Sequence, residues 1–268
     1  MQNPATFVKN NTQPTNIDTM LKEERHQLIL NEVALHNRVL LTDIAEVLNV
    51  SIDTVRRDVI QLDTEEKLKK VHGGAISLGY ANNTAEQTKV YALEKKKVIA
   101  QKAVKLLRNG NIIIIHGGTT CLEFSRNIPE KMSLTCFTLS LPVAIELCKK
   151  PKLEVIFLGG TMAKESQIAS GGQAIHNLSR ISADFGFIGT GYVDADYGLT
   201  EFDWESVQVK NAVIQASKST VLLTISEKLN SKNRYKTCEM SDINTMITEL
   251  EASDEKLKTF KGAGVNLL

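Results

Sequence analysis

Apolar residues recur three and four positions apart in three successive segments near the start of the chain, which predicts three helices. A break at residues 49–50 separates the second helix from the third, and Ser51 is placed to cap the third by accepting a backbone N–H bond. Two short helices joined by a tight turn form a helix-turn-helix. The residues expected on the buried faces are Leu28, Ile29 and Val33 in the first helix (21–36), Leu41, Ile44, Ala45 and Leu48 in the second, and Ile52, Val55, Val59 and Leu62 in the third.

The segment after the third helix has the pattern of a β-hairpin. Residues 68–78 (LKKVHGGAISL) form two short extended runs around Gly73 and Gly74. We expect this hairpin to be a wing that carries Lys69, Lys70 and His72 and that straddles the backbone of a bound nucleic acid.

The polar face of the third helix suits the major groove of DNA. At about 100° per residue, Asp53, Thr54, Arg57 and Gln61 lie nearly opposite the buried stripe. An arginine there can bond guanine with both of its outer nitrogens, and a threonine can touch a thymine methyl group or a phosphate. Arg56 lies closer to the flank, where a phosphate contact or an ion pair is expected.

Bulk charge does not favour DNA binding by this segment. Residues 20–76 hold eight Lys and Arg against ten Asp and Glu, a net charge of −2, and the whole chain is at +1. Any attraction to DNA must therefore come from local placement of the basic residues. A three-helix pattern with two arginines also occurs in domains that never bind DNA, so the pattern alone leaves both interpretations open.

The remaining polar segments mark the ends of the domains. Residues 1–19 are rich in Asn, Thr, Gln and Pro and predict a disordered leader without the apolar core of a signal peptide, and residues 77–93 predict a linker. No apolar run approaches the roughly 20 residues that cross a bilayer, so we expect a cytoplasmic protein. The four cysteines form no C-x-x-C pair, which favours reduced thiols and no metal or cofactor.

From residue 94 onwards the pattern predicts an α/β domain. A helix over residues 94–110 is expected to bury Val98, Ile99, Ala103 and Leu106. The four isoleucines at 112–115 predict a fully buried strand. Strand and helix patterns then alternate to about residue 225, which is typical of a mostly parallel sheet covered by helices.

Glycines gather where these strands are expected to end. The segment 117–120 (Gly-Gly-Thr-Thr) leads from a strand into a helix, so free N–H groups, the helix dipole and two hydroxyls converge on a potential phosphate site. Residues 159–160 and 189–191 supply two further glycine-bearing strand ends, although tight turns alone also require glycine. Lys210 and Lys228 are candidates for contact with a phosphate, with solvated surface lysines as the alternative.

Several strings resemble one known family over nearly the whole chain after residue 20. VSIDTVRRDVIQL (50–62) and KVHGGA (70–75), followed by IIIIHGGTTCLEF (112–124), LSLPVAIEL (139–147) and LGGTMAKESQIASGG (158–172), are similar in order to the DeoR family of sugar-metabolism repressors. The resemblance implies a winged helix-turn-helix over 20–76 and, over 94–268, an α/β sensor and oligomerisation domain related to the ribose-5-phosphate isomerase, glucosamine-phosphate deaminase and CoA-transferase-like folds.

The resemblance also assigns roles to individual residues. It implies that Thr42, Ser51, Thr54, Arg56, Arg57, Lys70 and His72 contact operator DNA, with Gly73 in the wing, and that Gly118, Thr119, Thr120, Ser140, Gly160, Lys210 and Lys228 line a sugar-phosphate pocket. The chain departs from the family at His116, Leu139 and Ile225, where the family usually has Asp, Asn and Asp. Leu and Ile cannot hydrogen-bond a sugar hydroxyl, so these departures predict an altered effector or loss of sensing.

We therefore expect a repressor that binds double-stranded operator DNA as a homodimer or tetramer. A phosphorylated sugar or related metabolite is expected to release it from the operator. One alternative is a sugar-phosphate isomerase or deaminase with an accessory DNA-binding domain. Its general base would come from Glu201, Asp203 or Glu205, although acidic surface turns are common and no catalytic residue is expected. Another is a constitutive DNA-binding scaffold whose α/β domain only mediates oligomerisation.

Overall fold

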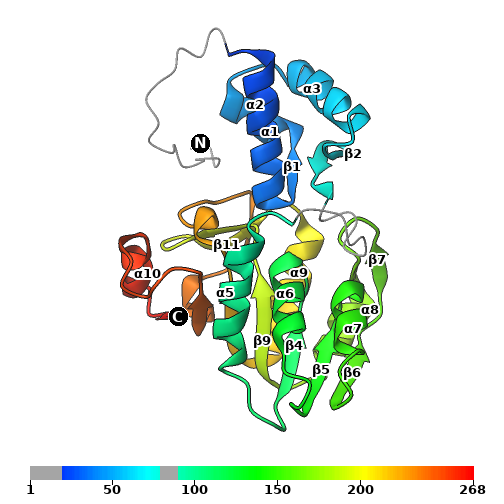
Figure 1. Ribbon diagram of the computed structural model, residues 1–268, viewed down its shortest axis with the longest axis vertical. Coiled ribbons are helices and arrows are strands. Elements are labelled where there is room, and N and C mark those ends of the chain that lie inside the picture. Colours follow the sequence, from blue (N-terminus) through cyan, green and yellow to red (C-terminus); the bar gives the residue numbers. More distant parts are fainter. Residues whose placement is uncertain (1–19, 79–89) are drawn as a thin grey trace. The chain divides into compact units, whose positions relative to one another are not determined.

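The computed structural model describes residues 20–78 and 90–268, which divide into an N-terminal unit, Met1–Tyr91, and a C-terminal unit, Ala92–Leu268 (Figure 1). The leader expected over 1–19 and the centre of the linker expected over 77–93 lie outside the described residues. No helix within the described ranges is long and apolar enough to cross a membrane.

The N-terminal unit consists of three helices and a small antiparallel sheet with strand order β1-β3-β2. The predicted helix-turn-helix and hairpin are confirmed, whereas the three-residue strand β1 between the first two helices was not predicted. The elements are α1 (Lys22–His36), β1 (Arg38–Leu40), α2 (Leu41–Leu48), α3 (Ile52–Thr64), β2 (Lys69–Val71) and β3 (Gly74–Ile76).

Local contacts fix the position of α3. The Ser51 hydroxyl oxygen accepts a bond from the Thr54 N–H at 3.1 Å, which confirms the predicted N-cap. On the inner side of α3, the buried Asp58 carboxylate accepts two bonds from the Arg25 guanidinium, at 2.9 and 3.2 Å, and lies 3.2 Å from His26 Nε2. Because Arg25 and His26 belong to α1, these contacts tie α3 to α1 and leave its outer face for a partner.

Two residues that were predicted to lie in the core of this unit are exposed instead. Ile52 is 42 % exposed because it opens α3 at the edge of the packed surface, and Leu28 is 39 % exposed. The core is built from Ile29, Val33, Val55 and other residues that are at least nine-tenths buried.

The C-terminal unit contains a seven-stranded sheet in which every pairing is parallel, in the order β15-β14-β12-β9-β4-β5-β6. This confirms the predicted α/β class. The strands of the sheet are β4 (Ile112–Ile115), β5 (Leu134–Thr138), β6 (Leu153–Phe157), β9 (Ala183–Gly189), β12 (Ser217–Leu223), β14 (Thr245–Ile247) and β15 (Asn266–Leu267).

Helices cover both faces of this sheet. The helices α5, α6 and α7 pack side by side on one face, and α8 and α9 pack together on the other (Figure 1). This arrangement follows from right-handed crossovers that leave β4 in one direction and β9 in the other. The helices are α5 (Leu93–Val104), α6 (Thr119–Asn127), α7 (Leu141–Leu147), α8 (Gly172–Leu178), α9 (Trp204–Gln215) and α10 (Lys258–Gly262), with short 3-10 turns η2 (Ser226–Lys228), η3 (Met240–Asp242) and η4 (Glu255–Leu257).

Two small antiparallel elements complete the unit and were not predicted. One is a three-stranded sheet with order β10-β11-β13, and the other is the hairpin β7–β8. Their bounds are β7 (Thr161–Ala163), β8 (Ile168–Ser170), β10 (Tyr192–Asp194), β11 (Gly198–Glu201) and β13 (Tyr235–Cys238).

The strand order reverses between β4 and β9. Strands β5 and β6 follow β4 on one side, and β12, β14 and β15 follow β9 on the other. At such a switch point the connections leave the carboxyl ends of neighbouring strands in opposite directions, which opens a crevice where ligands of α/β proteins bind. The fold thus places residues 116–120 and 190–191 next to each other at that edge.

The buried face of α5 differs from the prediction. Val98 is 39 % exposed and Leu106 is half-buried, while Lys96 is only 4 % exposed and lies on the buried face with Ile99 and Ala103. The prediction failed because Lys96 occupies a position on the buried face of the helix. The apolar residues therefore do not mark that face correctly. Ile112, the first residue of the predicted fully buried strand, is 37 % exposed.

Candidate functional site

The exposed face of α3 agrees with the predicted polar face. Asp53, Arg56 and Arg57 are exposed, and Thr54 is half-buried beside the cap. The Arg56 guanidinium pairs with the Asp53 carboxylate, the ion pair that was one of its two expected roles, and Arg57 Nε donates to the Asp53 backbone oxygen at 3.3 Å. This places two guanidinium groups side by side on the surface of one helix.

The predicted wing residues are also accessible. Lys70 is exposed on β2 and His72 is exposed in the turn before β3. The Lys70 N–H donates to Asp63 Oδ1 on α3 at 2.8 Å, so the wing is fixed relative to that helix. Thr42, the remaining candidate, is half-buried on α2 and its hydroxyl donates to Asp43 Oδ1 at 3.1 Å.

The loop after β4 is packed on one side and open on the other. Gly117 and Gly118 have φ angles of +145° and +87°, which favour glycine. A Cβ on Gly117 would lie 2.9 Å from the Ser140 Cβ, whereas a Cβ on Gly118 would meet nothing within 4 Å. Gly118 is the N-cap of α6, and no side chain in the described part of the chain caps that helix. The N–H groups of the first turn of α6, which begins with the buried Thr119 and the half-buried Thr120, therefore receive no side-chain cap from the N-cap residue.

Two lysines of the C-terminal unit, Lys228 and Lys96, are buried and interact through their charges. Lys228, 9 % exposed after β12, donates to the Thr190 backbone oxygen at 2.8 Å; burial lowers its pKa to about 8 despite the opposing charge of Glu201. Burial, followed by repulsion from Lys228, lowers the pKa of Lys96 to about 7. The positive charge of Lys228 thus disfavours the charged form of Lys96.

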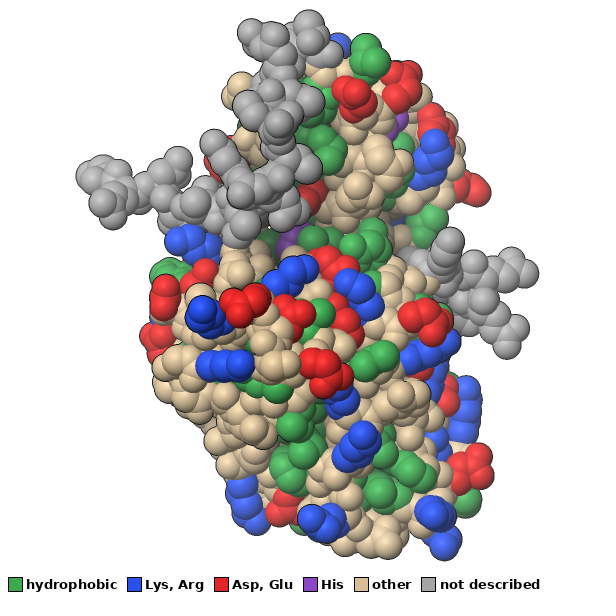
Figure 2. All heavy atoms as spheres, turned by 60° about the vertical axis from the view of Figure 1, so that its left-hand side comes forward, with side chains coloured by type: hydrophobic (Ala, Val, Ile, Leu, Met, Phe, Trp, Pro, Cys, Tyr) green, Lys and Arg blue, Asp and Glu red, His purple; other side chains and the backbone are tan. Residues whose placement is uncertain are grey.

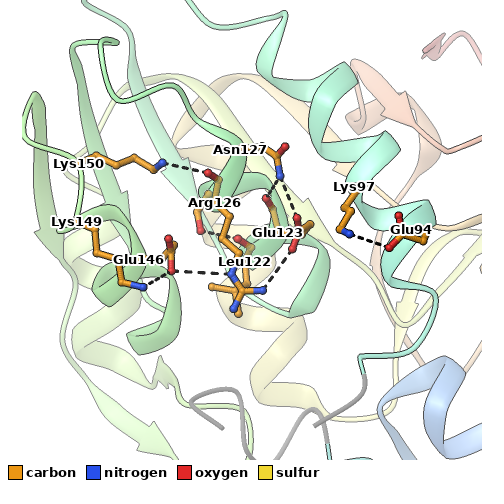
Figure 3. Close-up of polar contacts among 10 residues, drawn as sticks. Glu94, Lys97, Leu122, Glu123, Arg126, Asn127, Glu146, Lys149 and Lys150 are labelled. Carbon is orange, nitrogen blue, oxygen red and sulfur yellow. Dashed lines mark hydrogen bonds and ion pairs between the residues drawn. The ribbon is translucent and has the colours of Figure 1, made fainter. Parts of the chain in front are cut away.

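The carboxylates near these lysines are engaged by other cations or donors. Glu123 of α6 accepts bonds from Asn127 Nδ2 at 3.0 Å and from Arg126 at 3.4 Å, as Figure 3 shows, while Arg126 also approaches Glu146 of α7. Glu227 pairs with Lys95. Both carboxylates also act on Lys96, because their negative charges oppose the lowering of its pKa.

Lys210 is buried in an ion pair of its own. It is 6 % exposed on α9 and contacts the carboxylate of Glu201, which is 4 % exposed at the end of β11. Glu201 Oε1 also accepts from the Gly191 N–H at 2.9 Å and from the Thr190 hydroxyl at 3.4 Å. The positive charge of Lys210 is therefore neutralised inside the protein.

Ser140, Gly160 and His116 were also singled out in the sequence, and each has different surroundings in the structure. Ser140 is buried beside Gly117, and its N–H donates to Thr138 Oγ1 at 3.1 Å. Gly160 packs against β8 and α8: a Cβ there would lie 2.5 Å from the Ser170 carbonyl oxygen, so close packing already explains this glycine. Burial and the charge of Lys210 lower the pKa of His116 to about 3, so its imidazole is neutral near pH 7.

Two departures from the family pattern are buried apolar side chains. Leu139 is fully buried in the core of the sheet and Ile225 is 1 % exposed. No group of three or more His, Cys, Asp or Glu side chains within residues 20–78 and 90–268 is arranged to hold a metal ion, and all four cysteines are free thiols.

Sequence reasoning identified Lys210, Lys228 and the loop at 117–120, and the structure brings them together at one edge of the sheet. It missed Lys96, and it named Glu201 only as a candidate general base of the alternative enzyme, not as the partner of Lys210. Lys96 is the middle residue of three consecutive lysines, and nothing in the sequence distinguishes it from Lys95 and Lys97.

The lowered pKa of Lys96 predicts a pH-dependent stability. Between pH 7 and 10.5 the unfolded chain binds more protons at this residue than the folded chain, so wild-type stability rises with pH across that window. Replacing Lys96 by Met removes this effect. At pH 7 Lys96→Met should raise the melting temperature by about 5 °C, and the difference should shrink towards pH 10.

Thermal melts of wild type, Lys96→Met and the control Lys97→Met from pH 6.5 to 10 provide the measurement. Lys97 is partly exposed and paired with Glu94 (Figure 3), so its variant should follow the wild type over this range. A difference for Lys96→Met that stays constant or widens with pH would contradict the inferred burial of its charge.

Comparison with known proteins agrees with this organisation. Residues 25–79 match the model of the DeoR-like helix-turn-helix domain, and residues 92–250 match that of the DeoR C-terminal sensor domain. An uncharacterized HTH-type transcriptional regulator of Staphylococcus epidermidis is 32% identical over 77% of this chain and 84% of its own length. The glycerol-3-phosphate regulon repressor of Haemophilus influenzae is 29% identical over 85% of this chain and 90% of its own.

A characterised repressor and a solved structure are also similar to this chain. The HTH-type transcriptional repressor GlcR of Bacillus subtilis is 29% identical over 93% of this chain and 96% of its own length. Among solved structures, the ribose 5-phosphate isomerase of Methanocaldococcus jannaschii matches half of this chain and 53% of its own with a TM-score of 0.37 and 18% identity, a likeness too remote to bear on function. With both domain models matched in order and relatives that are named as regulators, the chain belongs to the DeoR family of transcriptional repressors and is a DNA-binding regulator, not an enzyme.

Proposed function

We propose that the chain binds operator DNA through α3 and the β2–β3 wing, and that a phosphorylated sugar or related metabolite releases it by binding at the carboxyl edge of the seven-stranded sheet. In this proposal the DNA-binding domain spans residues 20–76 and the sensing domain spans 94–268. The observation that carries the sensing half is the pair of buried lysines, Lys96 and Lys228, beside the uncapped N-terminus of α6.

DNA binding rests on local placement of the basic residues, since the N-terminal unit has no net positive charge over residues 20–76. On the face seen in Figure 2, basic and acidic side chains are interspersed over the larger unit, which agrees with the net charge of +1. Arg57 and Thr54 are proposed to meet base edges, with Arg56, Ser51 and Thr42 on the flanks of the groove. Lys70 and His72 would contact phosphates from the wing.

A phosphate fits the sensing site for two independent reasons. The first turn of α6 presents N–H groups and the positive end of the helix dipole, with the hydroxyls of Thr119 and Thr120 beside it. Lys96 and Lys228 each have a lowered pKa there, so a dianion would stabilise both ammonium groups. That related proteins are named as glycerol-3-phosphate regulon repressors supports an organic phosphate as the ligand class.

The effector is proposed to differ from those of relatives that have polar residues at Leu139 and Ile225. Both side chains are buried and apolar, so neither can bond a ligand hydroxyl. The neutral His116 imidazole offers one donor and one acceptor in the same region but no charge. We expect ordinary hexose phosphates to bind weakly for this reason.

The oligomeric state and the cellular localisation are proposed from the mode of DNA recognition. One helix-turn-helix reads one half-site, so operator binding by a homodimer or a tetramer is proposed. A regulator of operator DNA acts where bacterial-type chromosomes lie, in the cytoplasm. If no metabolite altered operator affinity, the C-terminal unit would be a constitutive oligomerisation scaffold instead.

Replacing Arg57 by Ala should weaken binding to the operator by about 1–3 kcal/mol, roughly 5- to 150-fold, and reduce discrimination against other sequences. The fold should persist because the side chain is exposed. The matched control Arg56→Ala should weaken binding to operator and to unrelated DNA equally. It should also reduce the slope of the logarithm of the binding constant against the logarithm of salt concentration by about one. Mobility shifts at several salt concentrations test both variants, and unchanged operator affinity for Arg57→Ala would overturn its assignment.

Replacing Thr119 by Val should weaken binding of a phosphorylated ligand by about 1–3 kcal/mol, since the variant keeps the shape of the side chain but loses a donor to the phosphate. Calorimetry with sn-glycerol 3-phosphate and with glycerol measures the effect. The control Thr161→Val changes an exposed threonine on β7 and should leave affinity unaltered. Equal affinities for the phosphorylated compound and its parent would remove the phosphate from the proposal.

A further inference from the structure

Strand β6 forms one edge of the seven-stranded sheet, and this edge is apolar. Four of its five residues, LEVIF, are apolar, and none of the five is fully buried. Proteins usually protect an edge strand by shortness, charge or proline, because an exposed apolar edge pairs with other strands. The opposite edge strand, β15, has only two residues, whereas β6 carries a single charge, that of Glu154. Strand β6 therefore lacks the protection that the other edge has.

The backbone groups on the outer side of β6 are unpaired. The Leu158 N–H donates to the Thr138 carbonyl oxygen at 2.8 Å, so the N–H and C=O groups of the even-numbered residues of β6 point towards β5. Those of Val155 and Phe157 point outwards, and they make no hydrogen bond in the part of the chain that the structure describes. The edge can accept one more strand.

The elements around this edge also expose apolar side chains. Within the described residues of the C-terminal unit, nine large apolar side chains are exposed, and four of them belong to α7, β6 and β7: Leu141, Ile145, Phe157 and Met162. Leu141 and Ile145 are four positions apart in α7, so they lie on the same side of the helix, and α7 packs against β6. Apolar side chains gathered at one place are typical of a contact with another protein.

We propose that β6 and α7 form a two-fold interface between two copies of this chain, in which the two β6 strands pair antiparallel and join two sheets into one. The inference rests on the proposed function in one respect, since paired operator half-sites call for two copies. A second copy is the partner that fits this edge. A two-fold axis sets a strand against itself in the antiparallel direction, which gives each unpaired N–H of one copy an unpaired C=O of the other.

The sequence of β6 favours one register for this pairing. With the axis at Val155, Leu153 faces Phe157 of the partner subunit, Glu154 faces Ile156 of the partner subunit, and all five residues are paired. A register centred on Glu154 would set two carboxylates directly against each other, which is unfavourable. A stable interface takes roughly 20–30 residues from each copy, so the exposed side of α7 must contribute beside the five residues of β6.

Sedimentation of the full chain over a range of concentrations measures its self-association. Ile145→Glu places a charge on the exposed side of α7 and should raise the dissociation constant of the assembly at least tenfold. The control Val98→Glu changes an exposed apolar residue of α5, which α6 separates from α7 (Figure 1), and should sediment like the wild type. Both side chains are exposed, so both variants should keep the melting temperature of the wild type.

Cross-linking tests the register directly. In a Cys148→Ser background, which removes the exposed thiol, Val155→Cys places two thiols opposite each other. The Cα atoms of such a hydrogen-bonded antiparallel pair are about 5.5 Å apart, a separation that a disulfide spans. Mild oxidation should give a covalent dimer. Ile112→Cys in the same background is the control, because it lies on an inner strand of the sheet and should remain a single chain on a denaturing gel.

The outcomes separate this interface from the proposed function. A wild type that stays monomeric, or one that assembles while Val155→Cys gives no cross-link, overturns the pairing of β6, and DNA binding and effector release still stand. A cross-link together with unchanged sedimentation of Ile145→Glu removes α7 from the interface. If the cross-link forms but no operator DNA is bound in mobility shifts, the proposed function fails and the interface stands.

Discussion

The burial of lysine ammonium groups at one edge of a parallel sheet is the constraint on which the sensing domain depends. A charged amine loses its hydration when it is buried, and it remains charged only where negative charge compensates. Lys210 pairs with Glu201, whereas burial lowers the pKa values of Lys96 and Lys228 to about 7 and 8. The folded protein therefore carries an electrostatic cost at this site, which the proposed anionic ligand would relieve.

The fold explains why these charges meet. The strand order reverses between β4 and β9, so the segments that follow those strands lie at the same edge. Gly117 lets the β4–α6 loop pack directly on Ser140, and Gly118 leaves open space before α6. The three lysines come from α5, α9 and the turn after β12, which are far apart in the sequence. Binding of the proposed ligand would therefore connect elements from both faces of the sheet. A ligand that favours one arrangement of these elements would change the affinity for DNA.

The parts of this structure that could be predicted from the sequence are those with local signals. Helical periodicity located α1, α2 and α3, the Ser51 cap was visible from its position, and the strand–glycine–helix pattern located the loop between β4 and α6. The failures have physical causes. Strand β1 has three residues and forms only by pairing with β3, Lys96 violates the apolar pattern of α5, and the Glu201–Lys210 pair depends on a strand-to-helix turn. Each of these follows from tertiary contacts that no local pattern reports.

The central claim is that an anionic ligand binds where the two lysines have lowered pKa values, and proton uptake tests it most directly. Calorimetric titration with sn-glycerol 3-phosphate at pH 8, in buffers of different ionisation enthalpy, measures the protons exchanged on binding. The ligand is already a dianion at that pH, while Lys228 is about half protonated and Lys96 mostly neutral. We predict a net uptake of protons that Lys96→Met and Lys228→Met each reduce; binding with no proton exchange, or with proton release, would contradict the account.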